Sequence, residues 1–108
     1  MKGFTITETS FAPNMWRVDF LDHDLIGNIL SGTYNAIAAR LFGLTYPEYL
    51  RYVRENYNAT IIGKNGYPFA AFKNAGDCNR LVKELNDRWD FVMAERARRG
   101  LSNIEEII

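Results

Sequence analysis

Three adjacent side chains in the N-terminal third of the chain are of the types that transfer protons or bind metal ions. Asp22 and Asp24 flank His23, the single histidine, and a carboxylate beside an imidazole can raise its basicity or complete a metal site. Neighbouring side chains on a loop do not converge on one point, however, and no second histidine is present. Asp24 is better interpreted as the N-cap of a following helix. We therefore predict no metal site.

The single cysteine and a glycine–lysine pair are the other candidates for chemistry. Cys78 lies near the start of a predicted helix, where the pKa of a thiol falls, but it shares an apolar face with Leu81 and Leu85, which indicates an unreactive core thiol. Segment 63–66 contains Gly-Lys without the Gly-x-x-x-x-Gly-Lys-Ser/Thr spacing that holds phosphates. The sequence thus predicts no catalytic residue and no cofactor, and we expect a protein that is not an enzyme.

Aromatic and arginine side chains outside the apolar helix faces point to a binding function. Tyr52 falls outside the apolar arc of its predicted helix, between Arg51 and Arg54. Phe91 points about 140° away from the centre of the apolar arc of the last helix, close to Arg88. Tyrosine and arginine are enriched at the hot spots of protein interfaces. We predict that these five side chains contact another protein, either a different protein or a second copy of this chain.

Nucleic acid is the alternative partner. Basic residues gather on and just after the last predicted helix and could form a local basic stripe. Acidic residues interleave with them, a pattern that is typical of a solvated helix face with i,i+4 ion pairs. A nucleic-acid-binding module or regulator therefore stays the second hypothesis. Its basic residues are Arg80, Lys83, Arg88, Arg96, Arg98 and Arg99.

Composition limits the classes of protein to which this chain can belong. Its 108 residues suit one domain, and 47% hydrophobic and 14% aromatic residues provide a core. Thirteen basic and thirteen acidic residues give a net charge of zero, which excludes a polycation that coats nucleic acid by charge alone. No apolar run is long enough for a membrane span or a secretion signal. With one cysteine and no intrachain disulfide, we expect a single cytoplasmic domain over 1–108.

The N-terminal segment, 1–43, is predicted to begin with a β-hairpin. Residues 3–9 and 15–21 are its strands, because apolar and polar side chains alternate in the second of them as in a half-buried strand. Pro13-Asn14 between them favours a turn. The two strands are therefore expected to pair antiparallel.

A helical segment is expected after this hairpin. Residues 22–42 carry apolar side chains at helical spacing, and Gly32 interrupts them at a cost of about 1 kcal/mol relative to alanine. We expect either one kinked helix or two helical pieces. Gly43 is predicted to end the segment.

The unit 44–100 is predicted to contain two helices with clear boundaries. Thr45 and Glu48 form a capping box, and the helix runs from there to about Tyr57. Asn74 caps a long helix that ends before Gly100. The apolar face of this long helix is expected to be the main contribution to the core.

A second β-hairpin is predicted between these two helices. Residues 59–64 and 67–72 are its strands, and Asn65-Gly66 is the strongest short signal for a two-residue turn, in which both residues take a positive φ. Such a turn pairs Ile62 with Phe69. Both faces of this hairpin carry apolar side chains, so we expect both to be covered.

The complete prediction is an α+β fold with a small antiparallel sheet. Its central unit is a helix, a β-hairpin and a long helix, and the N-terminal hairpin and helical segment pack beside it. The remaining segment, 101–108, is a tail that could form a last helical turn with Ile104, Ile107 and Ile108.

Residues 44–89 carry a resemblance. The run Leu-Thr-Tyr-Pro-Glu-Tyr-Leu from Leu44, a Gly-Lys-Asn-Gly hairpin, and Phe72-Lys73 leading into a helix that reaches Leu-Asn-Asp-Arg-Trp resemble small proteins of phages and mobile elements of Gram-positive bacteria. This resemblance implies a compact protein that inhibits a host protein, such as a defence nuclease, by occluding it, as anti-CRISPR proteins do.

Residues 59–89 are also similar to the arm-type DNA-binding domains of tyrosine integrases, through the order of hairpin and helix. Those domains imply a basic sheet face, whereas only Lys64 and Lys73 charge this hairpin. Neither resemblance supplies a functional motif that matches residue by residue. We therefore expect a small protein-binding domain, with nucleic-acid binding as the alternative.

Overall fold

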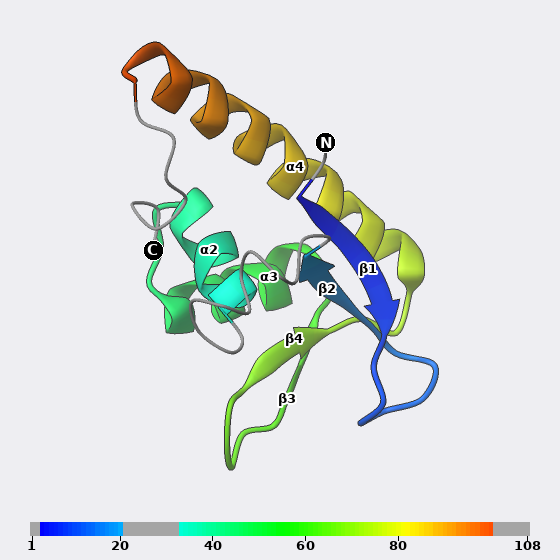
Figure 1. Ribbon diagram of the computed structural model, residues 1–108. Coiled ribbons are helices and arrows are strands. Elements are labelled where there is room, and N and C mark those ends of the chain that lie inside the picture. The colour runs from blue at the N-terminus through cyan, green and yellow to red at the C-terminus, as the bar shows by residue number, and fades with distance from the viewer. Residues whose placement is uncertain (1–2, 21–32, 101–108) are drawn as a thin grey trace.

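The computed structural model describes residues 3–20 and 33–100 and has an α+β fold, as the sequence predicts (Figure 1). Two antiparallel hairpins pack with helices in this described part of the chain. The elements are β1 (Phe4–Glu8), β2 (Trp16–Phe20), α2 (Thr33–Leu41), α3 (Tyr46–Asn56), β3 (Thr60–Ile62), β4 (Phe69–Ala71) and α4 (Ala75–Arg98).

Some predicted features lie outside the described residues. The segment Asp22 to Asp24, the helical piece expected before Gly32 and the last turn expected in 101–108 belong to this group. Helix α2 covers the remainder of the helical segment that the sequence predicts.

The N-terminal hairpin forms as predicted, with Phe4 opposite Phe20. Its turn is closed by the amide of Met15, which donates to the carbonyl oxygen of Ala12 at 3.0 Å. Between them lies Pro13-Asn14, in which Asn14 has φ +67°. Proline at the second position and a positive φ at the third are the features of a type II turn. The residues that predict the turn therefore also form it.

The first strand packs on α4 through one buried amide side chain. The Asn86 carboxamide accepts a hydrogen bond from the N–H of Phe4 at 2.8 Å and donates one to the carbonyl oxygen of Phe4 at 3.0 Å. These are the two bonds that a further strand would make at this position. Beside them, the ring of Phe20 packs edge-on against Phe4 at 5.0 Å and Trp89 at 5.2 Å. Asn86 thus joins the edge of β1 to the helix.

The second hairpin has the predicted register but a different turn. Ile62 pairs with Phe69 as expected, which confirms the alignment of the strands. The two-residue turn is wrong, because neither Asn65 nor Gly66 has a positive φ. Instead, Gly63 has φ +79°, and its carbonyl oxygen accepts a hydrogen bond from the N–H of Gly66 at 3.0 Å. The loop is longer and the strands shorter than the sequence predicts.

Pro68 explains why the ladder ends before the expected turn. Its ring fixes φ near about −65°, far from the value of about −140° in an antiparallel strand. Its carbonyl oxygen also accepts a hydrogen bond from the hydroxyl of Tyr46 at 2.6 Å. The chain at Pro68 is therefore held against α3 rather than paired with β3.

This turn geometry leads to a testable prediction at Gly63. We expect Gly63→Ala to lower the free energy of unfolding by about 1–3 kcal/mol, because alanine in the left-handed region is strained and its Cβ would lie 2.8 Å from the carbonyl oxygen of Tyr67. Gly66→Ala is the matched control: a Cβ there meets no atom within 4 Å, and we expect a change below about 0.5 kcal/mol. Urea denaturation measures both, and a larger loss at Gly66 would contradict the described turn.

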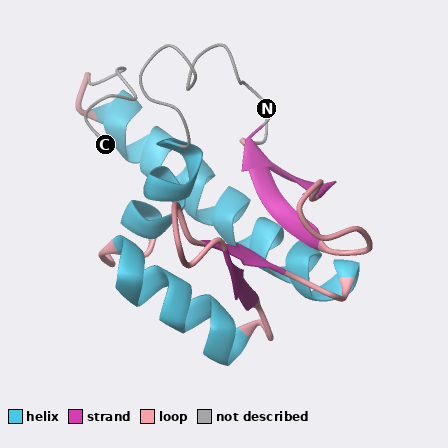
Figure 2. Ribbon diagram, turned by 90° about the horizontal axis from the view of Figure 1, so that it is seen from below, coloured by secondary structure: helices cyan, strands magenta, loops and turns pink. Residues whose placement is uncertain are grey.

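A single bridge connects the two hairpins. The N–H of Trp16 donates to the carbonyl oxygen of Phe72 at 2.7 Å, and the N–H of Phe72 donates to that of Trp16 at 2.6 Å. Seen from below, the second hairpin lies between α3 and the N-terminal hairpin (Figure 2). The two small sheets thus stay separate sheets that one isolated bridge joins.

Local capping signals account for the ends of α2 and α3. After α2, Gly43 has φ +69°, and the N–H of Leu44 donates to the carbonyl oxygen of Ala39 at 3.1 Å, as in a Schellman motif. Thr45 and Glu48 form the predicted capping box at the start of α3. These motifs place α3 directly after the turn that ends α2.

Helix α4 also has its predicted ends, and it carries much of the core. The side chain of Asn74 accepts a hydrogen bond from the N–H of Gly76 at 2.7 Å, and Gly100 has φ +75° beyond the last turn. The largest side chains that are fully buried come from all layers of the fold. They are Tyr49, Phe20, Phe72, Ile37, Leu81, Leu85, Val53, Thr9 and Cys78.

Candidate functional site

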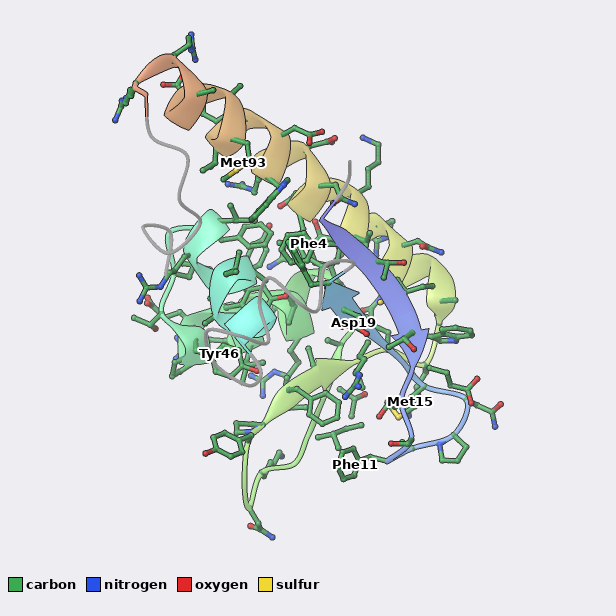
Figure 3. The ribbon with its side chains drawn as sticks, viewed as in Figure 1. Phe4, Phe11, Met15, Asp19, Tyr46 and Met93 are labelled. Carbon is green, nitrogen blue, oxygen red and sulfur yellow. The ribbon has the colours of Figure 1, made fainter. Side chains whose placement is uncertain are left out.

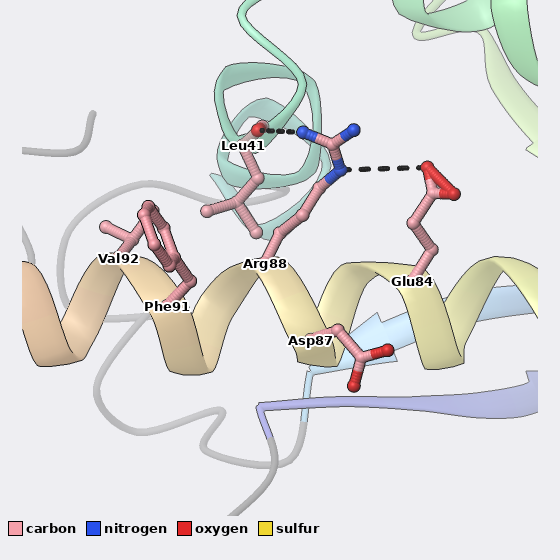
Figure 4. Close-up of a pocket in the computed structure, with 6 residues that line it drawn as sticks. All are labelled: Leu41, Glu84, Asp87, Arg88, Phe91 and Val92. Carbon is pink, nitrogen blue, oxygen red and sulfur yellow. Dashed lines mark hydrogen bonds and ion pairs between the residues drawn. The ribbon is translucent and has the colours of Figure 1, made fainter.

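An open hollow lies between α4 and the C-terminal end of α2. Its volume is about 480 Å³. Phe91 stands beside it with 67% of its surface exposed. Figure 4 shows the Arg88 side chain pointing across the hollow toward the end of α2, and Phe91 on the same helix about one turn further along. The lining residues are Leu41, Glu84, Asp87, Arg88, Phe91 and Val92.

Arg88 is held in place by three contacts. Its Nη1 donates to the carbonyl oxygen of Leu41 at 3.2 Å, and its Nε lies 3.6 Å from Oε1 of Glu84. The guanidinium also lies 4.4 Å from the centre of the Phe42 ring, a cation–π geometry. The carbonyl of Leu41 belongs to the negative end of the α2 dipole, which favours a cation. Arg88 therefore holds a defined position although 45% of its side chain is exposed.

Tyr52 contributes to this site from α3, but differently from the prediction. Its ring packs 5.0 Å from that of Phe42, and its hydroxyl donates to Oε1 of Glu84 at 3.4 Å. The interpretation that Tyr52 stands apart from the core is thus wrong, because Phe42 at the end of α2 partly covers it. The hydroxyl of Tyr57 donates to the other oxygen of Glu84 at 2.7 Å. Burial and this hydrogen bond raise the pKa of Tyr57 above its usual range.

The five predicted contact residues therefore fall into two groups. Tyr52 and Arg88 both contact Phe42 and Glu84, and Phe91 lines the same hollow as Arg88. Arg51 and Arg54 are exposed on α3, and neither lines the hollow. The structure brings together three of the predicted residues and leaves the other two on the outer surface of α3.

Two exposed aromatic side chains were not among the predicted contacts. Phe11 is 75% exposed in the loop between β1 and β2, and Tyr67 is 96% exposed in the loop between β3 and β4. Figure 3 shows Phe11 at the loop end of its hairpin, and its ring lies 6.0 Å from that of Phe69. An aromatic residue inside a segment with turn signals was the sequence feature that could have identified both.

Five basic residues on α4 or just after it form ion pairs with acidic residues of this helix. Arg80 pairs with Asp77 at 2.8 Å, and Lys83 pairs with Asp87 at 3.0 Å. Further pairs join Arg88 to Glu84, and both Arg98 and Arg99 to Glu95. The side chain of Arg96 lies outside the described part. This pairing supports the interpretation of a solvated, internally compensated helix face.

Cys78 is fully buried on the apolar face of α4, as the sequence predicts. Burial raises the pKa of its thiol to about 12.

Within residues 3–20 and 33–100, no group of three or more histidine, cysteine, aspartate or glutamate side chains could hold a metal ion. In the same part of the chain, no helix is both long enough and apolar enough to cross a membrane.

The burial of Cys78 predicts the reactivity of its thiol. At about pH 8, which is far below the raised pKa, we expect the native chain to react with a thiol reagent at least about 100-fold more slowly than the chain in denaturing urea. The absorbance of the thiolate that the reagent releases measures the rates of both reactions. Labelling of the native chain at the denatured rate would contradict the buried position.

Comparison with protein-family models, with curated proteins and with solved structures finds no match for this chain. The assignment of a function therefore depends on the residues themselves. Among the described residues, those at the hollow combine an exposed aromatic ring with a positioned guanidinium.

Proposed function

We propose that this chain is a non-enzymatic protein-binding domain that contacts its partner through the surface around Phe91 on α4. The observation that carries the proposal is the 67% exposure of Phe91 beside a hollow that also presents the guanidinium of Arg88. Phenylalanine and arginine are both enriched in protein interfaces, and arginine is also enriched at their hot spots.

The fixed position of Arg88 supports this proposal. Its contacts with Leu41, Phe42 and Glu84 hold the guanidinium before any partner arrives. A side chain that is already ordered loses less conformational entropy on binding, so more of the interaction energy contributes to affinity. The hollow is therefore suited to a partner that presents an apolar group to Phe91 and an acceptor to Arg88.

A narrower form of the proposal is that the chain inhibits a host protein, such as a defence nuclease, by occluding it. It is supported by the resemblance of residues 44–89 to small proteins of phages and mobile elements. Nucleic-acid binding through α4 remains the alternative. The ion pairs at Arg80, Lys83 and Arg98 favour the protein partner, because each compensates a cation that would otherwise bind phosphate.

Affinity capture tests the proposal. We expect the immobilised chain to retain a specific protein, either one from a lysate of a Gram-positive bacterium or added copies of this chain, and Phe91→Ala to lose it. Tyr67→Ala is the matched control, because it removes an even more exposed aromatic ring on a distant loop. Both variants should keep the thermal unfolding temperature of the parent chain. Retention of the protein by Phe91→Ala would overturn the proposal, and a salt-sensitive DNA or RNA complex without a protein would favour the alternative.

A further inference from the structure

One face of α4 carries a regular order of charges around Phe91. The five residues of this face, which we name the Phe91 stripe, follow one another at intervals of four, three, four and three positions. At about 100° per residue they fall within an arc of about 80°. The stripe consists of Glu84, Arg88, Phe91, Glu95 and Arg98.

Only the first half of the Phe91 stripe packs against other described elements. The carboxylate of Glu84 accepts hydrogen bonds from the hydroxyl groups of Tyr52 on α3 and of Tyr57 at the C-cap of α3. Arg88 contacts the end of α2. From Phe91 onward the helix extends past α3 and both hairpins (Figure 1). Phe91 and the side chain of Arg98 are 67% and 68% exposed, whereas the side chain of Glu95 between them is 34% exposed.

When the stripe is followed in the opposite direction, each charged position has the opposite sign. From its start, the stripe has an acid, a base, an aromatic ring, an acid and a base, so an antiparallel copy sets acid against base at every charged position. A parallel copy would set like charges together. With a rise of about 1.5 Å per residue, Glu84 and Arg98 lie equally far from Phe91 along the helix axis. The distances of Arg88 and Glu95 from Phe91 along this axis differ by about 1.5 Å.

We propose that the partner at the Phe91 surface is a second copy of this chain, with the two α4 helices antiparallel across a two-fold axis at Phe91. The two Phe91 rings meet at the axis, and Arg88 of each copy reaches Glu95 of the other. Within each chain, Arg88 contacts Glu84 and Leu41 through Nε and Nη1, so other N–H donors of its guanidinium can reach the partner. Glu95 also pairs with Arg98 and Arg99 of its own chain, and the Arg88 of the second copy joins these exposed pairs. This proposal rests on the proposed function, since it names the partner of the same surface.

The composition of the stripe makes the dimer weak and its direction specific. Exposed ion pairs contribute little to affinity, although like charges in contact oppose it. Phe91 therefore supplies most of the affinity, and the charges select the antiparallel arrangement. Two helix faces of this length bury less than the standard interface of about 1,600 Å². We expect a dissociation constant of roughly 10–100 μM or weaker.

Sedimentation equilibrium from about 10 μM to about 1 mM tests the dimer at concentrations around this constant. We expect the average mass of the wild-type chain to rise toward twice that of the monomer. Phe91→Ala should raise the dissociation constant at least about tenfold, whereas Tyr67→Ala should leave it unchanged. A dimer that is insensitive to Phe91→Ala would overturn the proposal.

Two charge variants test the direction of the helices. Arg88→Glu and Glu95→Arg should each associate more weakly than the wild-type chain, because each brings like charges together across the axis. An equimolar mixture of the two should associate again, because every facing pair then has opposite charges. Thermal unfolding of each variant shows whether the fold persists. Failure of the mixture of two folded variants to associate would overturn the antiparallel arrangement.

The same variants separate this inference from the proposed function. A wild-type chain that stays monomeric up to about 1 mM overturns the dimer. If Phe91→Ala nevertheless loses a captured protein, the surface binds a different partner and the proposed function stands. If Phe91→Ala changes neither the mass nor the capture, both proposals are wrong.

Discussion

Phe20→Ala is expected to lower the free energy of unfolding by about 3–5 kcal/mol, the usual loss for a phenylalanine removed from a close-packed core. Phe20 is 1% exposed and packs edge-on against Phe4 and Trp89. A Cβ built on Gly3 would lie 2.7 Å from the Phe20 ring, so no free space surrounds it. Because small domains are stable by only about 5–15 kcal/mol in total, this loss is a large part of the free energy that keeps the chain folded. Urea denaturation followed by tryptophan fluorescence measures the loss.

Phe91→Ala is the matched control for this substitution. The chemical change is the same, but Phe91 is 67% exposed. We expect a change below about 0.5 kcal/mol at concentrations where the chain is monomeric. Similar losses at Phe20 and Phe91 would show that the aromatic cluster at β1, β2 and α4 is not packed as described.

Asn86→Ala is expected to lower the free energy of unfolding by about 2–4 kcal/mol. The substitution removes the two hydrogen bonds between Asn86 and the backbone of Phe4. The buried N–H and carbonyl groups of Phe4 then lack partners, which costs about 1–3 kcal/mol for each group. Denaturation measures the loss of stability, and hydrogen exchange at the amide of Phe4 should become faster. An exchange rate at Phe4 equal to that of the wild-type chain would contradict the role of Asn86.

Asn86→Asp is expected to give a stability that depends on pH. An ionised carboxylate can accept the N–H of Phe4 but repels the carbonyl oxygen of Phe4, whereas a protonated carboxyl can both accept and donate. Burial and this repulsion should raise the pKa of the new carboxyl above its unfolded value of about 3.9. The folded state then binds more protons than the unfolded state between these two pKa values.

The stability of Asn86→Asp should therefore fall as the pH rises from about 4 toward 7, relative to that of the wild-type chain. Denaturation of both chains across this range measures the difference. Asn74→Asp is the control, because Asn74 is an exposed N-cap whose carboxylate is favoured at the start of α4. A constant difference between Asn86→Asp and the wild-type chain would contradict the buried hydrogen bonds.

The elements that local signals define are those that the sequence predicts best. The capping box of Thr45 and Glu48 and the glycine at position 100 act within one helical turn, so the bounds of α3 and α4 agree with the structure. The pairing of Ile62 with Phe69 follows from the length of the connection between two apolar runs. Such features need no knowledge of the remainder of the fold.

Features that depend on a distant partner were not predictable in the same way. The position of Tyr52 depends on Phe42, which lies in the turn after α2, and the end of the second ladder depends on the contact of Pro68 with Tyr46. Asn86 lies beside the apolar arc of α4, but nothing in the local sequence pairs it with the first strand. Of the site, the exposure of Phe91 was predictable from helix geometry alone.

The hydrogen bonds between Phe4 and Asn86 join residues that are 82 positions apart, and this separation affects the order of folding. The second hairpin, α3 and α4 follow one another closely and can associate by closing short loops. The first strand can reach α4 only by closing a loop of most of the chain, at an entropic cost that grows with its length. Contacts between distant residues slow folding. We expect the docking of the N-terminal hairpin to be the step that limits the folding rate.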